Sequence, residues 1–399
     1  MSESQLTHRC HIIPKWYMKW FAVWANKDII YYSDLTSDKI KIERKNWYEC
    51  DYWFHMDSYN FIDENWNIID WLESYYAHRE KKKSNELHKL LEHLYDMTKW
   101  INHLWINEKK WIVRILSILY EKVVYYHYLF PLLKWRNIIN KDWYYLLVRL
   151  LISFRLYWWV FLKLLLLKKF KWIILFCETP IFYFWDIPAH ITTNWYNNSL
   201  QDFLMNIWSN IIFPLSKNFL IAIENNNDNF WDTIVKVWKE YIISNFIEHV
   251  KKESLLSAVL NRLILNFQEY IAWPDKEIIE KAISARNIKN IYHRDVFIYA
   301  TCEKFWPMLD VWYKDLQWMG ENITNDYITH WIVKNHKIMT YLDELLDLEL
   351  VDYIAYVSDL SKCEINNILK HWDFEKIFGN FEIFWVKIRD KIWTNSIYR

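Results

Sequence analysis

Apolar residues recur with helical spacing along most of the chain after about residue 63. They fall at positions i, i+3, i+4 and i+7, which is the pattern of a helix with one buried face. In the first half, the pattern predicts helices at 65–80, 84–105 and 108–134. In the second half it predicts helices at 230–252, 254–273, 275–286, 293–318, 325–340, 341–358, 361–377 and 381–395. The predicted fold is therefore all-α, with about ten to thirteen helices in a large bundle or an irregular array of helical hairpins.

The N-terminal segment 1–62 has a different, mixed pattern. Trp16, Trp20 and Trp24 follow one another at intervals of four residues and would share one face of a short helix. After them, a β-prone run, a turn-like stretch and an alternating run lie within residues 27–54. This order predicts a small β-hairpin before the helical region begins.

Basic residues interrupt a long apolar segment at 134–171, where nine Lys or Arg accompany a single acid, Asp142. No uncharged stretch there reaches the roughly 18–20 residues of a membrane-spanning helix. The mixture suits a helix at a lipid surface, with Lys and Arg reaching the polar side. A long core helix whose basic groups reach the protein surface is the favoured interpretation. The candidate surface residues are Trp16, Trp20, Trp24, Arg149, Arg155, Trp158, Trp159, Lys163, Lys168, Lys169 and Lys171.

Pro180 and Pro188 mark the best candidate for a domain boundary. The predicted organisation is a mixed segment at 1–62, a helical region at 63–180 and a C-terminal helical domain at 181–399. The apolar stretch 203–223 carries Lys217 as its only charge and is interpreted as a kinked, buried helix. The pattern does not distinguish burial in protein from burial in a membrane, either there or at 143–177.

Glycine occurs only twice in the 399 residues, at Gly320 and Gly379. Phosphate-binding loops and dinucleotide-binding turns need glycine where the backbone meets the phosphate. Neither motif is present, and the G-x-S-x-G sequence of many hydrolases is absent as well. Lys+Arg and Asp+Glu are both 49, so the chain lacks the basic excess typical of a nucleic-acid-binding protein.

Three groups of residues are candidates for metal binding. Asp343, Glu344 and Asp347 form a D-[DE]-x-x-D pattern, which all-α isoprenoid synthases use to hold Mg²⁺ against a diphosphate. The alternative is an exposed acidic helix end, and no cofactor is predicted outside the enzyme interpretation. His88, Glu92 and Asp96 share a helix face, which is interpreted as solvated. The cluster of His8, Cys10 and His11 near the N-terminus is interpreted as an unoccupied terminal cluster.

Five widely separated cysteines without a C-x-x-C pair favour a reducing intracellular compartment over secretion. The N-terminus shows no apolar signal-peptide core. Residues with AT-rich codons are abundant, and the 28 Trp outnumber the 22 Phe. This bias is compatible with an AT-rich genome and with coding in a mitochondrion.

The aromatic content is the strongest functional indication, because Phe, Tyr and Trp make up 20% of the chain. Trp and Tyr are enriched at protein interfaces and at membrane boundaries. The leading hypothesis is a non-enzymatic, tryptophan-rich accessory subunit of a larger assembly, such as a mitochondrial membrane complex, with other protein subunits as partners. The alternatives are a soluble all-α enzyme with a magnesium–diphosphate site, and a peripheral scaffold that binds lipid.

Overall fold

The fold is that of a computed structural model of the chain. The described residues are 9–11, 13–21, 29–34, 41–44, 54–56, 61–62, 68–69, 71–100, 106–124, 151, 154–155, 158–167, 170–182, 184–185, 190–192, 210–225, 232–238, 270–273, 348–357 and 360–371.

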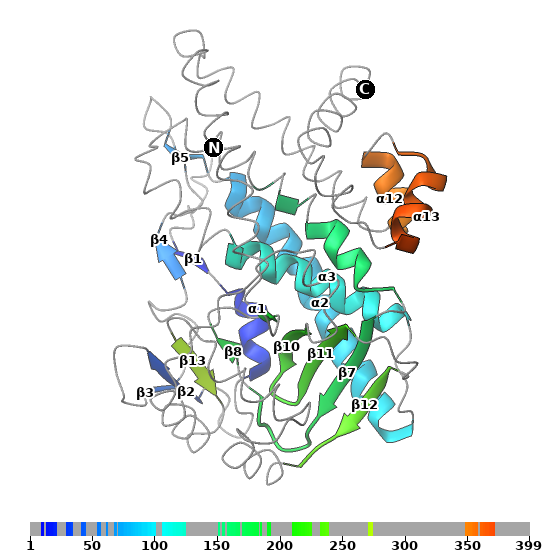
Figure 1. Cartoon of the computed structure of the whole chain (residues 1–399). Helices are drawn as coiled ribbons and strands as arrows, with labels where there is room; N and C mark the ends of the chain where they lie inside the picture. Colours follow the sequence, from blue (N-terminus) through cyan, green and yellow to red (C-terminus); the bar gives the residue numbers. More distant parts are fainter. Residues whose placement is uncertain are drawn as a thin grey trace.

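A five-stranded mixed sheet lies at the centre of the described fold, with the order β12-β7-β11-β10-β9. Strand β7 pairs antiparallel with β11 and parallel with the short edge strand β12. Figure 1 shows these strands side by side beneath the helices. The strands are β7 (Phe170–Phe176), β9 (His190–Thr192), β10 (Asn210–Ser216), β11 (Phe219–Asn225) and β12 (Thr233–Lys236).

The sheet overturns the all-α prediction, which was wrong. Residues 203–223, predicted as a kinked helix, contain β10 and most of β11, which pair as a hairpin across a turn at Lys217 and Asn218. Residues 230–252 and 254–273, also predicted as helices, contain strands β12 and β13 (Tyr270–Trp273). Residues 211–213 and 219–223 are buried on both faces of the sheet, so they show no polar alternation. A short apolar run of this kind has the same pattern in a strand and in a buried helix.

The second half of the basic apolar segment also differs from its prediction. Residues 158–164 are helical, but 170–176 form strand β7 rather than a continuation of the helix. Strand β7 comes before the predicted boundary at residue 180, and strand β11 comes after it. The two strands pair from Phe170 to Phe176, so the main sheet takes strands from both sides of that point.

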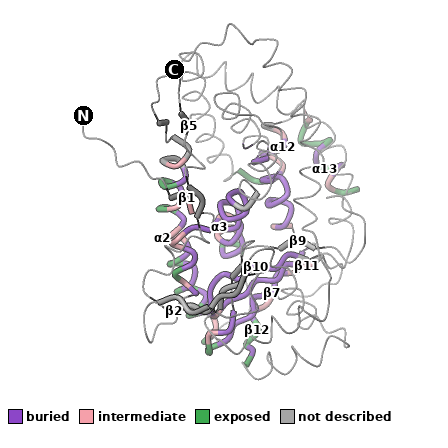
Figure 2. The backbone as a smooth tube through the Cα atoms, turned by 90° about the vertical axis from the view of Figure 1, so that its left-hand side faces the viewer, coloured by how far each residue is buried: buried purple, intermediate pink, exposed green. Residues whose placement is uncertain are grey.

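Two long antiparallel helices, α2 (Trp71–Trp100) and α3 (Ile106–Val124), pack beside the sheet. The sequence predicted a break near 78–84, but α2 continues through it, with Lys81 and Lys82 exposed on its outer side. Contacts from both helices reach the sheet: the ring of Tyr95 meets that of Phe176 at 5.9 Å. Figure 2 shows α3 and the central strands coloured mostly as buried.

The N-terminal part confirms one prediction and adds strands that the sequence pattern missed. Strands β2 (Ile29–Asp34) and β3 (Lys41–Arg44) pair antiparallel, as the predicted hairpin requires. They belong to a second sheet, of order β3-β2-β13-β8, which includes β8 (Phe184–Trp185). The remaining short strands pair as β1 (Arg9–His11) with β4 (Phe54–Met56) and β5 (Phe61–Ile62) with β6 (Ile68–Ile69).

Shorter helices complete the described structure. Helix α1 (Lys15–Met18) continues into η1 (Lys19–Phe21), where the sequence predicted a short helix. Near the C-terminus, α12 (Leu350–Val357) and α13 (Lys362–His371) lie within the predicted helices 341–358 and 361–377. In the part of the chain that is described, no helix combines the length and the apolar character needed to cross a bilayer.

Candidate functional site

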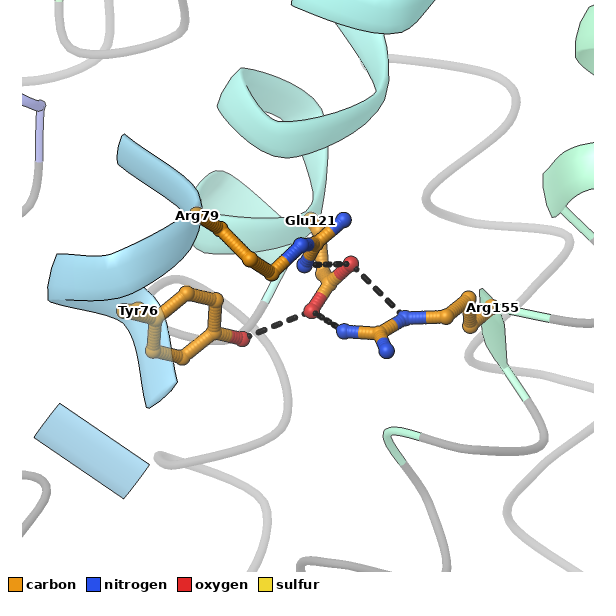
Figure 3. Close-up of polar contacts among 4 residues, drawn as sticks. All are labelled: Tyr76, Arg79, Glu121 and Arg155. Atoms are coloured by element: carbon orange, nitrogen blue, oxygen red, sulfur yellow. Dashed lines mark hydrogen bonds and ion pairs between the residues drawn. The ribbon is translucent and has the colours of Figure 1, made fainter. Parts of the chain in front are cut away.

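The carboxylate of Glu121 on α3 is buried and accepts four hydrogen bonds (Figure 3). Its Oε1 accepts hydrogen bonds from Tyr76 Oη at 2.9 Å and from Arg155 Nη2. Its Oε2 accepts from Arg79 Nη1 at 3.0 Å and from Arg155 Nε at 3.1 Å. Four donors occupy the roughly four lone-pair positions that an ionised carboxylate offers.

Three separate segments bring these groups together. Tyr76 and Arg79 are three residues apart on α2, so both project from the same face of that helix. Glu121 belongs to the facing side of α3, and Arg155 comes from the helical residues 154–155. All four side chains are buried, and Glu121 and Arg155 have no exposed surface. The cluster therefore ties three helical segments together inside the core.

Burial and ion pairing act in opposite directions on Glu121. Desolvation raises the pKa of its carboxyl, but the guanidinium groups of Arg155 and Arg79 outweigh this and hold the pKa at about 2. Burial and the neighbouring Glu121 charge both raise the pKa of Tyr76. The carboxylate is thus fixed in its charged form and the phenol in its neutral form. Such a carboxylate is a poor proton acceptor at neutral pH, and the geometry favours a structural cross-link.

A second ion pair extends the network along the same helix interface. Lys122, next to Glu121 on α3, pairs with Glu80 on α2, and its ammonium lies 5.5 Å from the centre of the Tyr76 ring. One turn further along α2, Lys83 pairs with Glu86 at 2.7 Å, and burial lowers the pKa of Lys83. The interface between α2 and α3 is therefore unusually rich in buried charge for a helix pair.

Stability should fall in acid because of this cluster. The folded carboxyl of Glu121 has a pKa of about 2 against an ordinary value of 4.5. The stabilisation of the folded state by the ionised Glu121 is complete above about pH 5. It disappears as the pH falls towards 2, because the unfolded chain binds a proton at a higher pH than the folded chain does. The difference between the two pKa values corresponds to a total loss of about 3 kcal/mol. Urea unfolding of wild type and Glu121→Gln between pH 7 and 3 should show a steeper decline for wild type, and parallel curves would contradict this.

The opposite end of the α2–α3 pair carries a different set of charges. Glu108, in the first turn of α3, lies with Oε1 2.7 Å from Nε2 of His93 on α2. Lys109 pairs with Asp232, whose other oxygen accepts a hydrogen bond from the backbone N–H of Trp172 at 2.9 Å. These contacts connect the start of α3 to the sheet at β7 and β12.

The residues predicted to form a membrane or partner surface are distributed between core and surface. Arg155, Trp158, Trp159 and Lys163 are buried. Trp16, Trp20 and Lys171 are partly exposed, and the Trp20 ring stacks on that of His88 at 5.6 Å. Trp24, Arg149, Lys168 and Lys169 lie outside the described residues.

The predicted metal-binding groups are not assembled among the described residues. Asp343, Glu344 and Asp347 lie outside the described residues, as does His8. His88 pairs with Glu92 at 3.4 Å with both side chains exposed, in agreement with a solvated helix face. The described part of the chain contains no group of three or more His, Cys, Asp or Glu placed to share a metal ion.

Sequence reasoning missed the Glu121 cluster, although one signal was present. Glu121 follows an uncharged, mostly apolar stretch that begins at Ile115, and an acid in such a position needs a buried partner. Its partners could not be identified from spacing, because Arg79 and Arg155 are distant in sequence. Comparisons with protein families, with characterised proteins and with solved structures gave no match for this chain.

Proposed function

We propose that this chain is a non-enzymatic structural subunit of a larger protein assembly, and that it binds its partner along the edge of the main sheet at β12. The single observation that carries the proposal is the exposure of Trp238 and Val235 at this edge. Trp238 is 65% exposed and Val235 is 38% exposed. Exposed apolar edge strands are sites where another chain adds to a sheet.

The exposure of Trp238 contrasts with that of the other described tryptophans. Trp158, Trp159 and Trp172 have no exposed surface, and Trp16, Trp20 and Trp111 are only partly exposed. Burying an exposed aromatic ring is favourable by about 25 cal/mol for each Å² of apolar surface removed from water. Trp is also among the residues that contribute most binding energy at protein interfaces. Trp238 is therefore a candidate anchor for a partner.

The backbone of β12 has the geometry that strand addition requires. The N–H of Val237 donates to the carbonyl of Phe176 on β7 at 2.8 Å. In a parallel ladder, alternate residues direct their N–H and C=O groups to opposite sides of the strand. Val235 and Val237 therefore face β7, while the backbone groups of Ile234 and Lys236 point away from it. A partner strand would bond to this outer row.

Replacing Trp238 with serine should remove the partner without unfolding the chain. The test is native mass spectrometry of the tagged chain after gentle purification from the cells that produce it. Wild type is expected in a stoichiometric complex, and Trp238→Ser as a monomer with unchanged circular dichroism. Exposed surface positions usually change stability by less than about 0.5 kcal/mol, so folding should be retained.

Two further variants make the test specific. Lys236→Pro removes an outward N–H and should weaken the complex, because proline is tolerated at an edge but cannot donate to a new strand. Leu348→Ser alters an exposed apolar residue (36% exposed) that is not part of β12 and should leave the complex intact. A wild-type monomer would contradict the proposal, as would equal losses in the Trp238 and Leu348 variants.

A further inference from the structure

We propose that His93 and Glu108 form a binding site for a divalent transition-metal ion of the Zn²⁺ class, bridging α2 and α3. The two side chains come from adjacent helices and approach to 2.7 Å between His93 Nε2 and Glu108 Oε1. Two donor atoms bound to one zinc ion at about 2.1 Å lie roughly 3 Å apart. Only a small outward movement would let an ion enter between them.

The second oxygen of Glu108 provides an independent reason for a ligand. Glu108 Oε2 is buried and accepts no hydrogen bond from any described residue. Burying a carboxylate oxygen without a hydrogen-bond partner destabilises the folded state by about 1–3 kcal/mol or more. The start of α3 favours a negative charge in its first turn, but that field does not supply a donor to Oε2. Chelation of a metal ion through both carboxylate oxygens would satisfy it.

The nearby charges leave this carboxylate available for a cation. Lys109 pairs with Asp232, and Lys110 pairs with Glu349 at 2.8 Å, so the next two basic residues of α3 have their own acidic partners. Glu108 interacts instead with an imidazole, which binds a metal ion in its neutral form.

The site also has an entrance. The His93 side chain is 46% exposed, whereas that of Glu108 is 7% exposed. An ion can therefore approach from solvent on the histidine side while the carboxylate holds it from within. The described residues supply two protein ligands, so water molecules would complete the coordination. An imidazole and a carboxylate together favour Zn²⁺ over Mg²⁺ or Ca²⁺, which prefer oxygen ligands.

The test is calorimetric titration of the reduced full-length chain with Zn²⁺, comparing four single variants. His93→Ala and Glu108→Gln should each remove one equivalent of bound zinc or weaken it at least about tenfold, since changing even an outer-shell partner has effects of 10–100-fold. The matched controls are His88→Ala and Glu92→Gln. They alter another His–Glu pair on α2 that is exposed on both sides (57% and 65%), and they should leave the titration unchanged.

Hydrogen exchange supplies a local readout that does not depend on counting equivalents. Zinc should slow amide exchange in 90–97 and 106–112 of wild type, because the ion bridges the two helices, and should not do so in Glu108→Gln. Circular dichroism of each variant verifies its folding. Equal zinc uptake in all four variants, loss of uptake in the His88 or Glu92 controls, or slowed exchange confined to other segments would overturn the proposal. The β12 surface takes no part in this site, so either inference can fail alone.

Discussion

Replacing Glu121 with alanine should destabilise the chain by about 3–5 kcal/mol, the usual result of removing one member of a buried ion pair. The loss arises because Arg79 and Arg155 remain buried without the carboxylate that accepts three of their hydrogen bonds. Typical domains have only 5–15 kcal/mol of stability in total. The measurement is the midpoint of urea unfolding, followed by circular dichroism and by tryptophan fluorescence.

A matched exposed pair provides the control for this prediction. Glu349→Ala removes the carboxylate that Lys110 contacts, but the two side chains are 72% and 38% exposed. An exposed pair of this kind contributes only about 0–1 kcal/mol. Similar shifts for Glu121→Ala and Glu349→Ala would contradict the assigned role of the cluster. The triple variant Arg79→Met, Glu121→Leu, Arg155→Met should recover most of the loss, because apolar groups of similar size need no counter-charge.

The sequence was informative about helices with one polar face. Helix α3 buries Ile112, Ile115 and Leu119 and begins close to its predicted start, because its apolar residues repeat at helical spacing. The β2–β3 hairpin was also predictable from alternation and a turn. In both cases one face of the element is distinguishable from the other along the sequence.

The central sheet was not predictable in the same way. Strands β7 and β11 are buried on both faces, so Ile173, Ile174 and Ile221 give an apolar run without a period. Such a run is the usual pattern of a strand buried within a sheet. A buried helix can have the same pattern, so only the pairing with other strands distinguishes the two. The scarcity of glycine reinforced the error, because the β10–β11 turn uses Lys217 and Asn218 instead.

The candidate sites depend on contacts that no local pattern contains. Arg79 lies at the end of the predicted helix 65–80, just before a run of lysines, and nothing in that pattern indicates that it is buried. It is buried because Glu121, 42 positions away, offers an acceptor. The sequence did not predict the β12 edge for a related reason: the exposure of a strand depends on which strand lies at the end of the sheet. Pairing between distant residues is fixed by topology, which hydrophobic periodicity does not encode.

Replacing Trp158 with alanine should have the second large effect, a loss of about 3–5 kcal/mol, the range observed when a buried aromatic is truncated. Trp158 has no exposed surface and stacks on Tyr120 at 4.3 Å and on Phe161 at 5.2 Å. Truncation would leave a cavity between these rings. Urea unfolding is the measurement, and Trp238→Ala is the control, because its ring is 65% exposed and its loss should change the midpoint little.

This comparison also separates the two interpretations of the basic apolar segment. A tryptophan that faces lipid or a partner contributes to binding and little to the stability of the isolated chain. A tryptophan inside the core contributes to stability and little to binding, since its removal leaves a cavity in a close-packed interior. If Trp158→Ala left the unfolding midpoint unchanged and abolished binding to lipid vesicles, the surface interpretation would hold. A large shift in the midpoint without any vesicle binding by wild type would place Trp158, three residues after Arg155, among the residues that hold the helices on the sheet.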